Sequence, residues 1–289
     1  MLGPAVEDAI EGIAADRTSS ASRLARVALE TIALVTIESA GWRNPDVLKE
    51  AAQRISEAQP VMAIVHNVVY LFAKLVAEGQ PPMDVLRELH AELETARERI
   101  ARTFLKVAIP KGTYVTLSYS DNVLESLRAA HERVSVARVF VMESGPMFEG
   151  RALAKSLAAS EIPATLVSDS EGPSHVKEAS AVVVGADSIL RDGSLINKTG
   201  TSSLAVAALE HAKPVYVLCE SMKFDSRYDA ATWPGAAAAL AGRSSAHVGD
   251  RLRQDFEVIP GKLITAIVTE RGRYTSDVIQ TMLSPGRKG

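Results

Sequence analysis

From Thr113 onward, short apolar runs alternate with segments of helical period, and this alternation limits the fold more than any other feature of the chain. The apolar runs predict strands at 114–117, 137–142, 164–167, 181–184, 214–218 and 264–269. Helices are predicted between them at 122–133, 148–159, 174–179 and 202–211. Strands and helices that alternate at short spacing predict a Rossmann-like, doubly wound parallel sheet. The first strand lacks a following Gly-x-Gly-x-x-Gly motif, which disfavours a dinucleotide as ligand.

The chain before this alternation predicts helices only. Apolar residues recur at helical spacing up to about residue 107, and Pro45 fits the first turn of a helix. Pro110-Lys111-Gly112 ends the helical part. We therefore predict an all-helical N-terminal domain at 1–110 and a Rossmann-like ligand-binding domain at 111–289.

Composition excludes several classes of protein. The net charge of -3 gives no electrostatic basis for direct nucleic-acid binding. No apolar run is long enough to predict a membrane span, and the N-terminus does not resemble a signal peptide. The single cysteine, Cys219, fits a reducing compartment, so we expect a cytoplasmic protein. The sequence indicates neither a cofactor nor a metal site.

Candidate site residues gather in the stretch 182–224. Gly185 ends a buried strand, and Asp187 follows at the carboxyl end, where open α/β sheets bind ligands. Asn197 and Lys198 precede a predicted helix whose free N–H groups and positive dipole end suit a phosphate. Lys223 lies just beyond the next strand. One carboxylate and two ammonium groups are thus predicted to converge at one edge of the sheet.

Each of these residues also has a structural interpretation. Asp187 and Asn197 fit turn positions, and Lys198 and Lys223 fit ordinary solvated lysines. Ser118 and Ser120, after the first strand, fit loop and helix-cap positions. Cys219 ends an apolar strand and fits a small buried hydrophobe.

Four motifs give the chain a family resemblance. They are GADSI at 185–189, INKTGT at 196–201, ESMKF at 220–224 and TERG at 269–272. In this order they resemble the family that joins the regulatory subunits of eukaryotic translation initiation factor two-B with the isomerases of methylthioribose-1-phosphate and ribose-1,5-bisphosphate. The resemblance implies a helical domain before a Rossmann-like domain, a sugar-phosphate site between the two, and a homodimer or larger homo-oligomer.

The resemblance also assigns roles to particular residues. It implies that Asp187 is one member of the catalytic pair of the isomerases, and that Ser120, Asn197, Lys198 and Lys223 bind ligand. The catalytic cysteine of the isomerases corresponds to Ser118. A serine hydroxyl needs an adjacent base to exchange protons, whereas a thiol titrates near neutral pH.

Three arginines of the bisphosphate isomerase are also replaced. Their positions read Ser19-Ser20, Ala58-Gln59-Pro60 and Glu143-Ser144-Gly145-Pro146. Each arginine can donate two charged hydrogen bonds to a phosphate, so their loss is expected to weaken a bisphosphate site by several powers of ten.

Three functions are compatible with this pattern. The favoured one is a non-catalytic protein, related to the initiation factor, that binds a phosphorylated sugar or nucleotide. The alternative is an aldose–ketose sugar-phosphate isomerase with a changed substrate, which uses Asp187 and a different proton donor in place of Ser118. The third is a scaffold for subunit assembly, for which the helical domain and a lid or subunit contact at 225–255 are the candidates.

Overall fold

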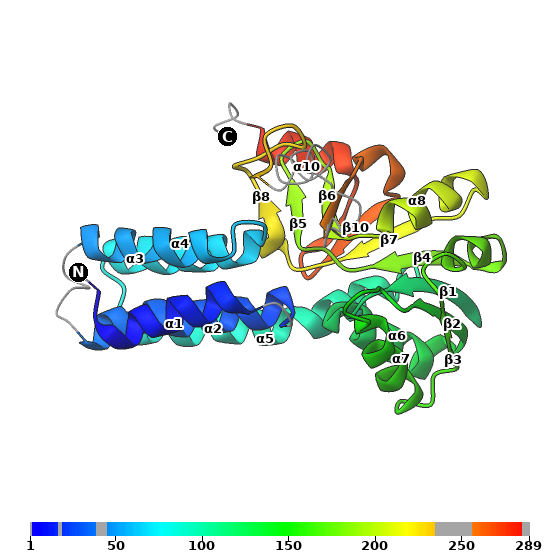
Figure 1. Ribbon diagram of the computed structural model, residues 1–289, viewed down its shortest axis with the longest axis horizontal. Coiled ribbons are helices and arrows are strands. Elements are labelled where there is room, and N and C mark those ends of the chain that lie inside the picture. Colours follow the sequence, from blue (N-terminus) through cyan, green and yellow to red (C-terminus); the bar gives the residue numbers. More distant parts are fainter. Residues whose placement is uncertain (1, 17–18, 39–44, 235–255, 285–289) are drawn as a thin grey trace, which may run out of the picture. The chain divides into compact units, whose positions relative to one another are not determined.

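The computed structural model describes residues 2–16, 19–38, 45–234 and 256–284. These residues form two compact units, Met1–Thr95 and Ala96–Gly289. The first is helical, and the second contains the sheet, with helix α5 (Pro82–Phe104) extending from one unit into the other (Figure 1). The predicted boundary near residue 110 lies a few residues beyond this helix, and the predicted lid or subunit contact lies largely outside the described residues.

The helical unit follows the periodicity of its sequence. Its other helices are α1 (Pro4–Ala15), α2 (Ala21–Glu38), α3 (Pro45–Ala58) and α4 (Ala63–Ala77), with α2 packed on α1 and α4. Helices α1, α3 and α5 each begin at a proline, as expected for a residue whose missing N–H has no partner in a first turn. The predicted helical character of the N-terminal region is confirmed.

All six predicted strands form one parallel sheet. They are β1 (Gly112–Leu117), β2 (Val136–Met142), β3 (Ala164–Val167), β4 (Ala181–Val184), β7 (Val215–Leu218) and β10 (Ala266–Thr269). The antiparallel β11 (Gly272–Tyr274) extends the sheet, whose order is β11-β10-β7-β4-β1-β2-β3. The predicted Rossmann-like fold is therefore confirmed, since the order reverses between β1 and β4 as in doubly wound sheets.

Side chains that alternate along the strands pack in two separate hydrophobic cores, one on each face of the sheet. On one face, Val115 and Val182 pack with α8 (Thr201–Glu210) and the 3-10 helix η2 (Gly172–Glu178). On the other, Tyr114 and Val183 pack with α6 (Asp121–Val134), α7 (Glu149–Ala158) and the end of α5. A sheet buried on both faces explains why its strands read as continuous apolar runs.

A second, smaller sheet was not predicted. It contains β8 (Phe224–Asp225), β5 (Ser188–Leu190), β6 (Leu195–Lys198) and β9 (Phe256–Ile259), in that order. Two further 3-10 helices, η3 (Ser221–Lys223) and η4 (Gly261–Leu263), and the last helix, α10 (Ser276–Leu283), complete the unit. None of the helices in the described ranges combines the length and apolarity that crossing a bilayer requires.

Candidate functional site

The candidate site lies where the strand order reverses. Ser120 follows β1, and Gly185 and Asp187 follow β4, so the two loops leave neighbouring strands at their carboxyl ends. The loops are in contact, because a Cβ atom on Gly185 would lie only 2.7 Å from Ser120 Oγ. Gly185 is thus required for this close approach. Ser120 is also the N-cap of α6, as its structural interpretation predicted, and its Oγ accepts a hydrogen bond from the Val123 amide.

Asp187 is in an unusual electrostatic environment. Burial raises the pKa of its carboxyl group from 3.8 to about 6, although Lys223 and Lys198 oppose that rise; Glu149 adds to it. Asp187 is therefore within electrostatic reach of each of the two predicted lysines. A carboxyl group that titrates near pH 6 can give or take a proton close to neutral pH.

The two lysines are not ordinary solvated side chains. Lys223 is 4% exposed, and its Nζ lies 3.1 Å from Oε2 of Glu220. Burial lowers the pKa of Lys223, but Glu220 and Asp187 outweigh burial and raise it above its ordinary value. Glu220 also accepts a hydrogen bond of 3.0 Å from Asn122 Nδ2, which ties the start of α6 to this pair.

Lys198 has a carboxylate partner of its own. Its Nζ donates to Glu149 Oε1 at 2.7 Å, and Glu149 lies in the first turn of α7. The other oxygen, Glu149 Oε2, is buried and has no hydrogen-bond partner among the described residues. A buried acceptor without a donor is costly, so a hydroxyl group that reached this oxygen would relieve that cost.

The helix predicted to receive a phosphate is already capped. Asn197 is buried, but its Nδ2 donates to Thr201 Oγ1 at 2.9 Å within the loop. At the start of α8, the amides of Gly200 and Ser202 both donate to Glu257 Oε1, at 2.9 and 2.7 Å. Two of the N–H groups expected to be free at this helix start are therefore occupied, and a carboxylate from β9 supplies the negative charge that the dipole favours.

The small sheet is the frame that brings the site residues together. Asp187 immediately precedes β5, and Lys223 immediately precedes β8, its parallel neighbour. Lys198 is the last residue of β6, and β6 pairs with the edge of β5 opposite to β8. Glu257 lies on β9, opposite Asn197 of β6. The spacing of these side chains is thus set by strand register.

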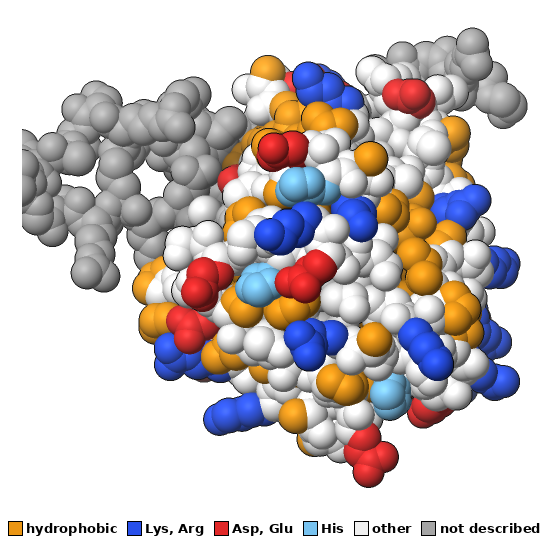
Figure 2. Space-filling view, turned by 90° about the vertical axis from the view of Figure 1, so that its right-hand side faces the viewer, with side chains coloured by type: hydrophobic (Ala, Val, Ile, Leu, Met, Phe, Trp, Pro, Cys, Tyr) orange, Lys and Arg blue, Asp and Glu red, His pale blue; other side chains and the backbone are white. Residues whose placement is uncertain are grey.

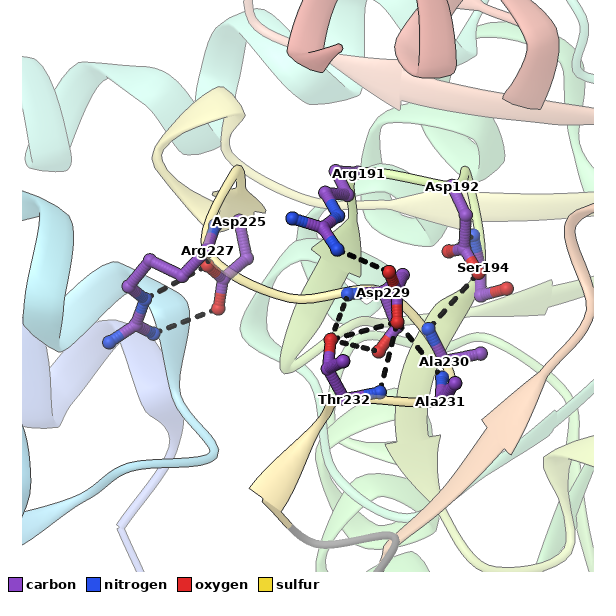
Figure 3. Close-up of polar contacts among 9 residues, drawn as sticks. All are labelled: Arg191, Asp192, Ser194, Asp225, Arg227, Asp229, Ala230, Ala231 and Thr232. Carbon is purple, nitrogen blue, oxygen red and sulfur yellow. Dashed lines mark hydrogen bonds and ion pairs between the residues drawn. The ribbon is translucent and has the colours of Figure 1, made fainter. Parts of the chain in front are cut away.

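Polar contacts beyond β5 and β8 hold the two strands together (Figure 3). Arg191, just after β5, pairs with Asp229, and its amide donates to the Tyr228 carbonyl at 3.0 Å. Asp192 accepts a hydrogen bond of 3.0 Å from the Ala230 amide. Arg227 pairs at 2.8 Å with Asp225, the last residue of β8, and so stabilises the segment that follows this strand. The pairing with Arg191 holds the pKa of Asp229 well below its ordinary value. These contacts restrain the frame on the side away from Asp187 and Lys223.

The loops after β1 and β2 meet at Ser118. Its backbone lies in the left-handed region with φ 57°, and its amide donates to Ser144 Oγ at 2.7 Å. Ser144 and Gly145 donate their amides to the two carboxylate oxygens of Asp169, both at 2.8 Å. Where the resemblance would place an arginine after β2, the chain therefore has Gly145, which has no side chain and whose amide is bound by Asp169.

The other two sites of arginine replacement also have internal roles. Gln59 is buried, and its Nε2 donates to the carbonyls of Ile13 and Asp16, at 2.8 and 3.0 Å. The amide of Ser19 donates to Asp16 Oδ1 at 2.9 Å. Both contacts tie together segments of the helical unit.

Three partners of the site were missed by sequence reasoning, namely Glu149, Glu220 and Glu257. Glu220 had a local signal, since it precedes Lys223 by three residues. The other two had none, because Glu149 and Lys198 are 49 residues apart and Glu257 reaches α8 across a strand pairing. Cys219 is buried as predicted, and burial raises the pKa of its thiol.

No group of three or more His, Cys, Asp or Glu side chains within the described ranges is arranged to hold a metal ion. Figure 2 shows one face of the molecule, on which Lys and Arg side chains lie among Asp and Glu side chains.

Comparison with known proteins agrees with the fold. The model of the initiation factor 2 subunit family matches residues 17–276. The crystal structure of the Pyrococcus horikoshii OT3 translation initiation factor eIF-2B is 27% identical, with a TM-score of 0.79 over 95% of this chain and 98% of that one. The ribose 1,5-bisphosphate isomerase of Archaeoglobus fulgidus is 29% identical, over 96% of this chain and 92% of its own.

A third relative is the methylthioribose-1-phosphate isomerase of Anaeromyxobacter sp. strain K, which is 34% identical over 82% of this chain and 76% of its own. The family model, the sequence relatives and the solved structure agree in covering most of the chain. The chain therefore belongs to the initiation factor 2 subunit family.

Proposed function

We propose that the protein binds a phosphorylated sugar or nucleotide at the carboxyl end of the sheet without turning it over. The observation that carries this proposal is the cluster of Asp187, Lys198 and Lys223 beside Glu149 Oε2, an oxygen without a hydrogen-bond partner in the described part of the chain. Lysine ammonium groups have three donors each, so both retain donors for a phosphate after pairing with a carboxylate. Asp187 and Glu149 offer acceptors for sugar hydroxyl groups.

The absence of turnover follows from the proton-transfer groups. Ser118 replaces the thiol that the resemblance assigns to catalysis, and its amide is held by Ser144. The single thiol of the chain, Cys219, is buried with a raised pKa, which makes it a poor substitute. An aldose–ketose exchange moves one proton between adjacent carbon atoms and another between their oxygen atoms. Asp187 supplies a single proton-transfer group, which is not enough for both movements.

Thermal unfolding with and without ribose 5-phosphate tests the binding. We expect a ligand-dependent rise in Tm, because a ligand that binds only the folded state stabilises it. Lys198→Met should abolish this rise, whereas Lys262→Met, at an exposed position on η4, should retain it. An unchanged Tm at millimolar ligand would refute the proposal.

An isomerase activity with a changed substrate is the second candidate. Asp187, whose pKa of about 6 suits general acid–base work, is the observation that favours it. Turnover of any pentose phosphate that Asp187→Asn abolishes would establish the enzyme and displace the non-catalytic proposal. Ser118→Cys separates the two further: in a binding protein it leaves turnover absent, whereas in an isomerase it should raise the rate.

We also propose that the protein works as a homodimer or larger homo-oligomer in the cytoplasm. Helix α8 exposes Val206 and Leu209 at helical spacing, and α10 exposes Val278 and Met282 in the same manner. Exposed apolar residues of this kind are frequent in subunit interfaces. Light scattering should give a mass of at least twice 30.9 kDa, and Leu209→Glu should reduce it.

A further inference from the structure

The start of helix α8 leads to an inference about ligand selectivity, which rests on the proposed function. In this turn, the amides of Gly200 and Ser202 share one acceptor, Glu257 Oε1. The hydroxyl groups of Thr201 and Ser203 donate instead to backbone carbonyls, at 2.6 and 2.7 Å. All four of these donors are thus satisfied by the protein itself.

Backbone geometry fixes Glu257 in this position. Gly200 has a φ of 107°, a left-handed value that favours glycine, and this conformation turns its amide toward β9. Glu257 pairs in register with Asn197, only three residues before Gly200. The register of β9 therefore places the carboxylate beside the helix start.

The negative charge of Glu257 matters because of where Lys198 lies. Lys198 ends the strand opposite β9 and is two residues from Gly200, so an anion bound by Lys198 lies on the same rim as the capped helix start. A second phosphate that approached α8 would meet a carboxylate and find the amides of Gly200 and Ser202 occupied. The carboxylate of Glu257 and a phosphate carry like charges and repel each other, most strongly where water is partly excluded.

We propose that Glu257 acts as an internal anion that closes the start of α8 to phosphate, so that the site selects ligands with a single phosphate group over bisphosphates. Lys198 and Lys223, which both act on the carboxyl group of Asp187, then bind the one remaining phosphate together. The ligand class that follows is a sugar monophosphate or nucleoside monophosphate. Glu257 is in this sense a specificity-determining residue that repels one class of ligand.

The test compares the wild type with Glu257→Gln and Glu257→Ala. Glutamine keeps an acceptor for the two amides and removes the charge, whereas alanine vacates the position. Glu132→Gln, near the C-terminal end of α6, is the matched control for the loss of one negative charge. Isothermal titration with inorganic phosphate, ribose 5-phosphate and ribose 1,5-bisphosphate gives the affinities, and thermal unfolding checks that each variant is folded.

We expect the wild type to prefer the monophosphate to the bisphosphate by about tenfold or more, the scale of one or two charged hydrogen bonds. Glu257→Ala should bind the bisphosphate at least about tenfold more tightly, with a smaller gain in Glu257→Gln and none in Glu132→Gln. Equal preference ratios in the wild type and the Glu257 variants would overturn the inference. If the wild type binds neither sugar, the proposed function fails. Inorganic phosphate then decides the inference, which is upheld only by tighter binding to Glu257→Ala.

Discussion

Replacing Asp187 by asparagine should change how the stability of the sheet unit depends on pH. Burial is the main reason that the pKa of this carboxyl rises from 3.8 to about 6. Between these values the folded protein holds a proton that the unfolded chain has released. Stability contributed by the neutral carboxyl is therefore present below pH 4 and is lost as the pH rises through about 6. Asparagine is neutral at every pH and removes this loss.

The size of the effect follows from the two pKa values. Their difference is about 2.2, and each unit corresponds to about 1.36 kcal/mol, so ionised Asp187 costs the folded state about 3 kcal/mol. The wild type should lose this amount relative to Asp187→Asn between about pH 4 and pH 7, with little further change above pH 7. For a unit of this size, the corresponding difference in Tm is roughly 6–12 °C.

Tryptophan fluorescence can follow this unit selectively. The chain has two tryptophans, and Trp233 is buried in the sheet unit. A Trp42→Phe background leaves Trp233 as the only tryptophan, and urea unfolding at several pH values then gives the free energies. Asp277→Asn, at an exposed position in the first turn of α10, controls for the change of net charge. If the wild type and Asp187→Asn show parallel pH dependence from pH 4 to 7, the electrostatic account of Asp187 is wrong.

Two further substitutions test the structure of the site. Lys223→Met should lower the free energy of unfolding by about 3–5 kcal/mol, because it leaves buried Glu220 without its cation. Urea denaturation beside Lys262→Met as an exposed control checks this, and a loss equal to that of the control would contradict it. Gly185→Ala should cost about 1–3 kcal/mol, since its Cβ would lie 2.7 Å from Ser120 Oγ. The double variant with Ser120→Ala should recover part of that cost, and strictly additive losses would exclude the predicted contact.

The main sheet could be predicted from the sequence because each of its parallel strands is buried on both faces. A strand such as β4 consists only of Ala and Val, and its apolar run ends at Gly185. Such runs carry a strong local signal. Burial of the strands in two separate cores is consistent with that reading.

The small sheet could not be predicted in the same manner. Strands β5 and β8 are three and two residues long, too short for a periodic pattern. The small sheet also pairs residues that are far apart in sequence. Ile189 of β5 pairs with Phe224 of β8, and Lys198 of β6 pairs with Phe256 of β9. The family motifs nevertheless pointed to Asp187, Lys198 and Lys223, and the frame explains why motifs separated in sequence meet.

The acidic partners of the site offset the cost of burying its two lysines. Two buried lysines would be costly on their own, and Glu220 and Glu149 each supply a charge and a hydrogen bond that offset this cost. A phosphate must therefore compete with contacts that the protein already makes, and it gains less than it would in a pocket of unpaired arginines. This competition predicts modest affinity and ready release. Both properties suit a protein that responds to the concentration of a metabolite more than one that must hold a substrate through a chemical step.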